Sequence, residues 1–237
     1  MYLTRFRFNT ARLSARRLLS SPQAMHAAVM SAFPDVCSGV GGGPRVLWRV
    51  DHNRANSEVL LYIVSPARPD LTHLVEQAGW PVAAPEGWET RPYAPFLSRL
   101  TAGTRWNFRL TANPVHHIRR KSGEPIKRTA HLTPRYQVRW LLDRQERAGF
   151  RILERTEQEP RLPREDNYEV MVHSRRRMAF SKMDRATGEK HPVTLVAATF
   201  DGRLEVTDPD TLRHTLTAGL GKGKAYGCGL LTLAPVE

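Results

Sequence analysis

The spacing of apolar residues switches between the two-residue period of a strand and the 3.6-residue period of a helix, in the same order in both halves of the chain. In the first half the order is strand, helix, strand, strand, helix and a last extended segment. The expected segments cover residues 2–8, 22–33, 45–50, 59–64, 70–78 and 88–97. Alternation is clearest in the first of them, where Phe6 and Phe8 share one face and Arg5 and Arg7 share the other.

The first expected helix has a clear start and a continuous apolar face. Ser21 is expected to cap its N-terminus, with Pro22 at the first helical position. The residues expected to face the core, at the spacing of one helix face, are Met25, Ala28, Val29, Ala32 and Phe33. His26 follows the first of these by about 100° around the helix axis, so its imidazole is expected at the edge of the buried face.

The second half of the chain repeats this order less regularly. Strands are expected at residues 105–110, 151–155, 168–173, 193–200, 203–206 and 230–234, and helices at 133–148 and 210–218. The residues of the first of these helices that are expected to face the core are Val138, Leu141, Leu142 and, less regularly, Tyr136. The repeated βαββαβ order predicts an α+β chain of two tandem ferredoxin-like domains, with antiparallel sheets and helices on one face. The proline-bearing stretch 81–95 indicates the boundary and gives domains at 1–97 and 103–237.

Basic residues outnumber acidic ones and are unevenly spread. The chain has 36 Lys and Arg against 23 Asp and Glu, a formal charge of +13. Residues 1–34 hold five arginines and no acid, residues 105–139 hold nine basic residues and one acid, and a third basic cluster covers residues 175–185. This balance favours a polyanion as the partner.

Composition also excludes several classes of protein. Cys37 and Cys228 are too few for a disulfide framework or a zinc cluster. The apolar runs are too short for a membrane span of about 18 residues or for a secretory signal. An arginine-rich start is also typical of mitochondrial transit peptides, but residues 2–8 have the pattern of a strand and not of an amphipathic helix. A cytoplasmic protein without membrane contact is therefore expected.

The most unusual segment is Gly-Leu-Gly-Lys-Gly-Lys-Ala-Tyr-Gly-Cys-Gly at residues 219–229, called the glycine loop below. It is not a Walker A loop, because neither Lys222 nor Lys224 is followed by Ser or Thr. Its backbone amides, among them those of Gly221 and Gly223, and its two ammonium groups suit a phosphodiester. The alternative is an ordinary flexible turn from a helix into a strand.

Among the histidines, His26 is placed best for general acid–base catalysis, because a half-exposed imidazole titrates near neutrality. The alternative is a surface histidine without a role. No histidine pair has the spacing of a metal site, and no acidic cluster suggests magnesium. Phosphodiester chemistry without a metal or other cofactor is therefore expected.

Basic side chains in three regions are candidate contacts to a nucleic acid. The loop at 113–121 suits phosphate binding or is simply a solvated face, and the run at 175–182 suits a nucleic-acid backbone or is an edge strand protected by charge. Together with the glycine loop, the candidates are Arg5, Arg16, Arg17, Arg119, Arg120, Lys121, Arg175, Arg176, Arg177, Lys182, Gly221 and Gly223.

Four segments carry a resemblance to a known family. They are Met-Tyr-Leu-Thr-Arg at the start, Ser-Pro and Met-His at 21–26, Arg-Leu-Thr-Ala-Asn-Pro at 109–114, and the glycine loop through Pro235. In order and over the whole chain they resemble the CasE family, the CRISPR precursor-RNA endoribonucleases of type I-E Cascade. The resemblance implies two tandem RAMP domains of ferredoxin-like fold and metal-free cleavage at the 3′ base of the CRISPR repeat stem-loop. It also implies that the crRNA product is retained and that the chain joins other Cascade subunits.

The resemblance also implies roles for individual residues. His26 matches the family's catalytic histidine, and the glycine loop matches the signature loop near the scissile phosphate. Better-known members have tyrosine where this chain has Gln23, whose amide can orient a group but cannot transfer a proton. Some members also have Lys or Arg where this chain has Ala27 and Ser31. Lys222, Lys224 or an N-terminal arginine is therefore expected to stabilise the charge of the transition state.

The expected mechanism is attack of a ribose 2′-OH on the adjacent phosphate, which gives a 2′,3′-cyclic phosphate and a 5′-OH. His26 is expected to act as general base, general acid or both. A second hypothesis is a non-catalytic RNA-binding subunit of a ribonucleoprotein, which Gln23 favours. A basic DNA-binding protein ranks lowest.

Overall fold

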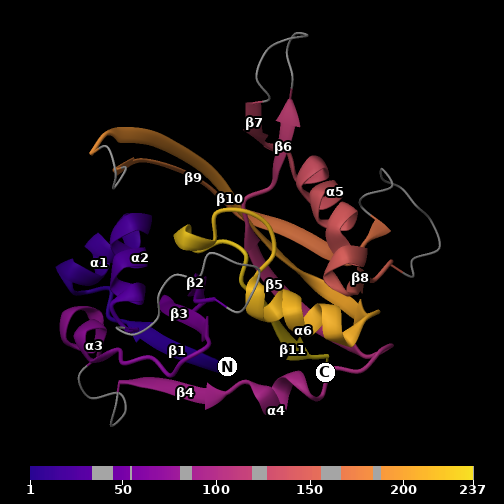
Figure 1. Cartoon of the computed structure of the whole chain (residues 1–237), viewed down its shortest axis with the longest axis horizontal. Helices are drawn as coiled ribbons and strands as arrows, with labels where there is room; N and C mark the ends of the chain where they lie inside the picture. Colours follow the sequence, from indigo (N-terminus) through magenta and orange to yellow (C-terminus); the bar gives the residue numbers. More distant parts are fainter. Residues whose placement is uncertain are drawn as a thin grey trace.

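The computed structural model describes residues 1–33, 45–53, 55–80, 87–118, 127–155, 167–183 and 188–236. Each half of the chain builds its own antiparallel sheet (Figure 1). The first half contains β1 (Tyr2–Phe8), α1 (Leu13–Ser20), α2 (Pro22–Met30), β2 (Leu47–Asn53), β3 (Glu58–Ser65), α3 (Thr72–Ala78), β4 (Trp88–Pro92) and α4 (Ala94–Leu97). Its strands lie in the order β2-β3-β1-β4, and each neighbouring pair is antiparallel.

The second half repeats this arrangement around a longer strand. It contains β5 (Arg105–Ala112), β6 (Val115–Ile118), β7 (Lys127–Ala130), α5 (Pro134–Gln145), the 3₁₀ turn η1 (Glu146–Ala148), β8 (Phe150–Ile152), β9 (Val170–Met183), β10 (Lys190–Val206), α6 (Pro209–Ala218), the 3₁₀ turn η3 (Lys224–Tyr226) and β11 (Leu231–Pro235). The strand order is β11-β5-β10-β8, with β9 also paired to β10, while β6 and β7 form a separate hairpin. The predicted fold of two tandem ferredoxin-like units is confirmed, and the boundary between residues 97 and 103 stays a prediction.

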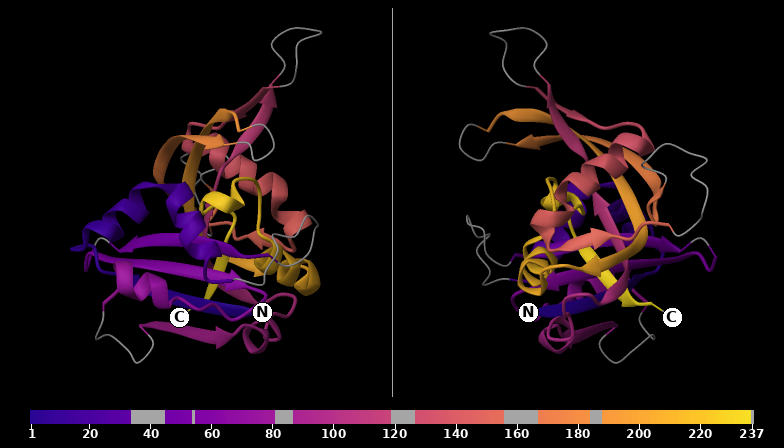
Figure 2. Two further views of the ribbon diagram at one scale, coloured as in Figure 1. Left: turned by 60° about the vertical axis from the view of Figure 1, so that its left-hand side comes forward. Right: turned by 90° about the vertical axis from the view of Figure 1, so that its right-hand side faces the viewer.

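The strands of the second unit are longer than predicted. The strands expected at 193–200 and 203–206 are one strand, β10, and the strand expected at 168–173 continues far beyond that range as β9. Gly202 lies inside β10, where it pairs with Val170 of β9 and Phe108 of β5 and does not end the strand. Glycine is required there because a Cβ would overlap the carbonyl of Glu169. The two strands form a curved hairpin that extends from the sheet over α1 and α2 (Figures 1 and 2).

Three predictions about helices and their surroundings are corrected. Helix α1 is absent from the sequence prediction, because its residues include only one buried position, Ala15. The extended segment expected at 88–97 ends at Pro92, and the short helix α4 follows. Tyr136 does not face the core but is 58% exposed, and Trp140 on α5 is buried. In the part of the chain described here, no helix is both long and apolar enough to cross a membrane.

The two units share part of their apolar core. Phe6, Met25 and Leu61 pack between the first sheet and its helices. Leu47 and Tyr93 of the first unit, however, belong to the core of the second sheet. The units therefore form one packed body, and α2 and the glycine loop have fixed positions relative to each other.

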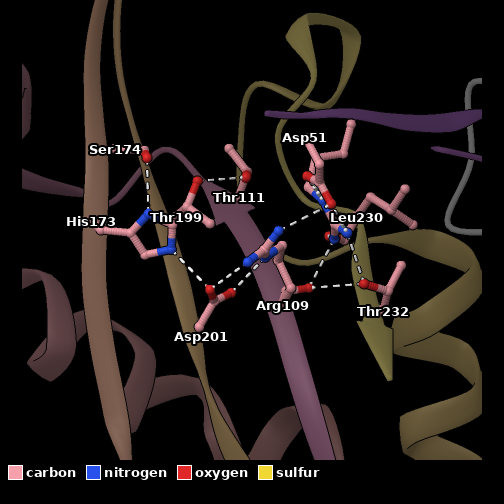
Figure 3. Close-up of polar contacts among 10 residues, drawn as sticks. Asp51, Arg109, Thr111, His173, Ser174, Thr199, Asp201, Leu230 and Thr232 are labelled. Atoms are coloured by element: carbon pink, nitrogen blue, oxygen red, sulfur yellow. Dashed lines mark hydrogen bonds and ion pairs between the residues drawn. The ribbon is translucent and has the colours of Figure 1, made fainter. Parts of the chain in front are cut away.

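Arg49 on β2 is a polar connection between the units. Figure 3 shows its partners Asp51, Leu230 and Thr232. Arg49 is 2% exposed, and its Nε and Nη2 donate to the carboxylate of Asp51 at 2.7 and 2.9 Å. Its Nη1 donates to the carbonyl oxygens of Arg109 and Leu230 in the second unit, at 2.9 and 3.0 Å. Its Nη2 also donates to the Thr232 hydroxyl at 2.9 Å. One buried guanidinium thus binds β2, β5 and the segment that enters β11.

The substitution Arg49→Met is expected to lower the free energy of unfolding by about 3–5 kcal/mol, because it leaves the largely buried Asp51 carboxylate with only the longer contact to Arg109 and removes the side-chain donor of two carbonyls. Arg139→Met is the matched control, since Arg139 forms an exposed ion pair with Asp143 on α5, a kind worth about 0.3–0.5 kcal/mol. Urea unfolding followed by circular dichroism measures both. Equal stability of the two variants would contradict the assigned role of Arg49.

Candidate active site between the two units

His26 lies on α2, and the local sequence sets its position. The Ser21 side chain accepts a hydrogen bond from the Ala24 amide, so the predicted cap is confirmed. Met25 and Val29 face the core, which leaves the next residue, His26, half-buried at the edge of that face. Its Nδ1 atom is buried and has no hydrogen-bond partner among the described residues. Burial lowers the pKa of the imidazole below its ordinary value of 6.5, so the ring is neutral at pH 7.

The glycine loop brings a tyrosine to the same place. The ring of Tyr226, on η3, lies edge-on to the His26 ring with 6.4 Å between ring centroids (Figure 1 shows the loop beside α2). Its other aromatic neighbour is Phe180 of β9, with 4.6 Å between centroids. Burial raises the pKa of the Tyr226 phenol, which therefore remains protonated at neutral pH. The sequence prediction omits this residue, although it is the one aromatic side chain in the loop.

The loop conformation depends on glycine and is not that of an ordinary turn. Gly223 and Gly227, on either side of η3, both have left-handed backbone, with φ of +84° and +77°. A Cβ at Gly227 would lie 2.8 Å from the Trp48 ring, so the loop backbone packs directly on the first unit. The Gly229 amide donates to the Thr111 carbonyl at 2.7 Å and ties the loop to β5 as well.

The two lysines of the loop have different surroundings. The Lys224 ammonium donates to the carbonyl of Ala218, the last residue of α6, at 2.7 Å. Burial and the nearby Arg45 and Lys222 lower the pKa of that ammonium. Lys222 is exposed, and its backbone forms an isolated bridge with Asn113. Lys224 thus braces the loop against α6, and Lys222 is the lysine that faces solvent.

Gln23 connects α2 to the β9–β10 hairpin. Its Nε2 donates to the Ser181 carbonyl at 2.6 Å. Arg176 makes a parallel connection, since its Nη2 donates to the Leu19 carbonyl of α1 at 3.2 Å. The amide of Gln23 is thus occupied by the protein itself, and its role toward a substrate stays a prediction.

The other predicted basic residues lie at several places. Arg5 is on the face of β1 opposite the core residue Phe6 and pairs with Glu89 at 2.9 Å. Arg16 donates to the Ala11 carbonyl, and Arg175 to the Leu132 carbonyl. Arg17 lies in the last turn of α1, and Arg177 is exposed on β9. Arg119, Arg120 and Lys121 lie outside the described residues, as does the side chain of Lys182.

Of the two cysteines, Cys228 lies among the described residues. Cys228 is fully buried beside Met178 and Ala197, and burial raises the pKa of its thiol to about 12. It therefore remains a protonated thiol at neutral pH. Cys37 lies outside the described residues.

Comparisons with known proteins identify the family to which the chain is similar. A family model described as CRISPR associated protein matches residues 1–235. The CRISPR-associated endoribonuclease Cse3 of Thermus thermophilus is 34% identical over 235 residues, which cover 99% of this chain and 100% of that protein.

Solved structures give the same result. A CRISPR endoribonuclease Cse3 bound to 19 nt RNA matches with a TM-score of 0.72 at 31% identity, covering 99% of this chain and 100% of that one. Thermus thermophilus Cse3 bound to an RNA representing a pre-cleavage complex matches with a TM-score of 0.68 at 31% identity, covering 99% and 98%. Cas6e from Escherichia coli str. K-12, at 20% identity and a TM-score of 0.58 over the full length of both chains, has the same fold.

The packing of the loop on Trp48 predicts different effects for two glycine substitutions. Gly227→Ala combines left-handed strain with overlap on the indole ring and is expected to lower the free energy of unfolding by about 2–4 kcal/mol. Gly223→Ala is the control, since its φ is similar but the nearest side-chain atom would be 3.5 Å from the new Cβ. Strain alone, about 1–2 kcal/mol, is expected there. Similar losses in urea unfolding would show that the Trp48 contact contributes nothing.

Proposed function

The chain belongs to the family of CRISPR-associated proteins, and we propose that it is an endoribonuclease that cleaves CRISPR precursor RNA. The observation that carries the proposal is the contact between α2 and the glycine loop, which places a neutral imidazole beside a segment rich in backbone amides and positive charge. The names of the similar proteins support the reaction class, since they are endoribonucleases and their structures contain RNA.

In the proposed mechanism the 2′-OH of the nucleotide before the cut attacks the neighbouring phosphorus in line. His26 takes the hydroxyl proton, and Nε2 is the atom assigned to this step because Nδ1 is buried. The bond from phosphorus to the 5′ oxygen breaks, and that oxygen leaves as a 5′-OH after gaining a proton, which protonated His26 returns directly or through a water relay. The upstream product ends in a 2′,3′-cyclic phosphate. A positioned acid–base group contributes about 10²–10⁴-fold to such a step.

The additional negative charge on the phosphorane is assigned to the glycine loop. The backbone amides of Gly221 and Gly223 and the ammonium of Lys222 are proposed to lie against the phosphate oxygens, where fixed donors stabilise developing charge. Lys224 is assigned a supporting role, because its ammonium already binds the α6 carbonyl. Gln23 is assigned to positioning, because its amide holds the β9–β10 hairpin.

The stem of the repeat is proposed to bind basic side chains from several parts of the chain. The contacts are to phosphates and shape, because the major groove of A-form RNA is too narrow for ordinary side-chain reading. The residues proposed for these contacts are Arg5, Arg16, Arg17, Arg119, Arg120, Lys121, Arg175, Arg176, Arg177 and Lys182. Cleavage at the 3′ base of the stem, retention of the crRNA, assembly with other Cascade subunits and a cytoplasmic location complete the proposal. A chain of the CRISPR RNA-guided surveillance complex, pre-nicking, shares the fold of this protein at 23% identity and a TM-score of 0.63.

A non-catalytic RNA-binding subunit is the second candidate, because Gln23 cannot transfer a proton. The two candidates share the fold and the basic side chains and differ only in whether the RNA is cut. A cleavage assay with the cognate repeat RNA therefore separates them.

The substitution His26→Ala is expected to reduce single-turnover cleavage of the repeat RNA in EDTA by about 10²–10⁴-fold, because it removes the proton acceptor. Affinity for the stem-loop, measured by filter binding, is expected to remain unchanged. His214→Ala, at an exposed histidine of α6, is the control and should cleave like the unsubstituted protein. Binding without cleavage by the unsubstituted protein would favour the second candidate, and cleavage lost in EDTA would contradict the metal-free mechanism.

The pH dependence of cleavage follows from the same imidazole. Burial favours the neutral form and lowers the pKa of His26, and a general base must be neutral to accept the proton. Activity is therefore expected to persist as pH falls to 6.5 and to decline only below it, through the lowered pKa. Single-turnover rates between pH 5 and 8 test this. A decline that is already complete at pH 6.5 would contradict a neutral His26 as base.

A further inference from the structure

A cavity of about 170 Å³ lies between α1–α2, β2 and the β9–β10 hairpin, next to His26. Its lining includes Tyr226 and Gly227 of the glycine loop but not Gly221, Lys222 or Gly223, the residues assigned to the phosphate. Its walls come from both units and include Met25 of α2, Trp48 of β2, Met178 of β9 and Tyr226 of η3. Met25 is the residue before His26, and the Tyr226 ring contacts the His26 ring. A group in this cavity is therefore a direct neighbour of whatever binds at the imidazole.

The walls have the chemistry of a site for a flat, partly polar ring. Trp48 and Tyr226 offer aromatic surface, and two methionines offer soft, adaptable contacts. The Nε1 of Trp48, a side chain only 4% exposed, is itself buried and is not accessible from the cavity, so Trp48 contributes only the accessible part of its ring surface to the lining. Arg176 and His52 add positive or polar groups to the lining.

The size of the cavity limits the occupant. Pockets for drug-sized ligands measure about 300–1,000 Å³, so about 170 Å³ accommodates one ring system and no attached sugar and phosphate. Two hydrogen bonds join the hairpin to the helices beside the cavity and fix its width: Gln23 to the Ser181 carbonyl and Arg176 to the Leu19 carbonyl. The cavity is thus a preformed part of the structure.

We propose that this cavity binds the unpaired nucleobase of the first nucleotide on the 3′ side of the cleaved phosphate. This inference rests on the proposed function. A cut at the 3′ base of a stem leaves that nucleotide without a pairing partner, so its base can leave the stack without breaking a base pair. Unstacked bases in RNA-binding proteins are held by aromatic side chains and by hydrogen bonds to their edges. A base held here turns the phosphodiester out of the A-form path, in which the 2′-OH is poorly aligned for in-line attack.

The test measures binding of uncleavable RNA to the whole protein. Two repeat stem-loops carry a 2′-deoxy nucleotide before the cut and end one nucleotide beyond it, and they differ only in whether that last nucleotide has a base or is abasic. The Kd of the abasic RNA is expected to be about 5- to 150-fold higher, the range for loss of one base stacked on aromatic side chains. Equal Kd values for the two RNAs overturn the proposal.

A pair of matched variants ties the effect to this cavity. Met178→Trp fills the cavity and is expected to abolish the difference in Kd between the two RNAs. Met171→Trp is the control, because Met171 is on the same strand but lines the wide cleft on the other side, and it should keep the full difference. Ala197→Leu fills the cavity less drastically and serves if the first variant does not fold. If a folded variant with the cavity filled still shows the full difference in Kd between the two RNAs, the base does not bind in this cavity. Cleavage does not enter this measurement. A chain that binds RNA without cutting it would therefore contradict the proposed function but would not affect the outcome of this binding test.

Discussion

The buried guanidinium of Arg49 is the interaction on which the site geometry depends. Its donors bind β2 in the first unit and, in the second, the carbonyls of Arg109 and Leu230. Leu230 directly follows Gly229, the last residue of the glycine loop. The contact that joins the two sheets therefore also fixes the end of the loop, and through it the distance between Tyr226 and His26. A site built from the first helices and the last loop of the chain needs a contact that holds the two units in fixed positions, and Arg49 provides one.

Arginine suits this contact between the two units because its planar guanidinium presents five donors in fixed directions. Burial of the charge is unfavourable by itself, and the carboxylate of Asp51 compensates it at 2.7 Å. The pairing of arginine with aspartate continues beyond Arg49 and Asp51, since Arg109 lies 3.5 Å from Asp51 and 2.6 Å from Asp201 (Figure 3). Hydrogen bonds to Asp201 raise the pKa of the Arg109 guanidinium, which stays charged. Positive and negative groups thus alternate from buried Arg49 through Asp51 and Arg109 to Asp201, which lines a cleft between the sheets.

Local patterns in the sequence were enough to predict the repeated βαββαβ order, the Ser21 cap and the edge position of His26, but not α1, α4 or the β6–β7 hairpin. Contacts made only in the folded chain were not predictable. Arg49 stands in an apolar strand pattern and has no feature that marks it as buried, and Gly202 resembles a strand break until the neighbouring Glu169 carbonyl is known. Tyr226 was missed for the same reason, because its proximity to His26 arises from the packing of Gly227 on Trp48. The family resemblance identified the loop but not which of its side chains approaches the histidine.

The half-buried position of His26 matters most once RNA is bound. A phosphate close to an imidazole favours the protonated form and raises its pKa, which would block a general base at neutral pH. Burial acts in the opposite direction and lowers the pKa of His26 in the free protein. The ammonium of Lys222, assigned to the same phosphate, further reduces the negative charge that the ring experiences. Desolvation and the loop cation therefore offset the effect of the substrate's own charge, so that the imidazole stays able to accept the 2′-OH proton when the phosphate is in place.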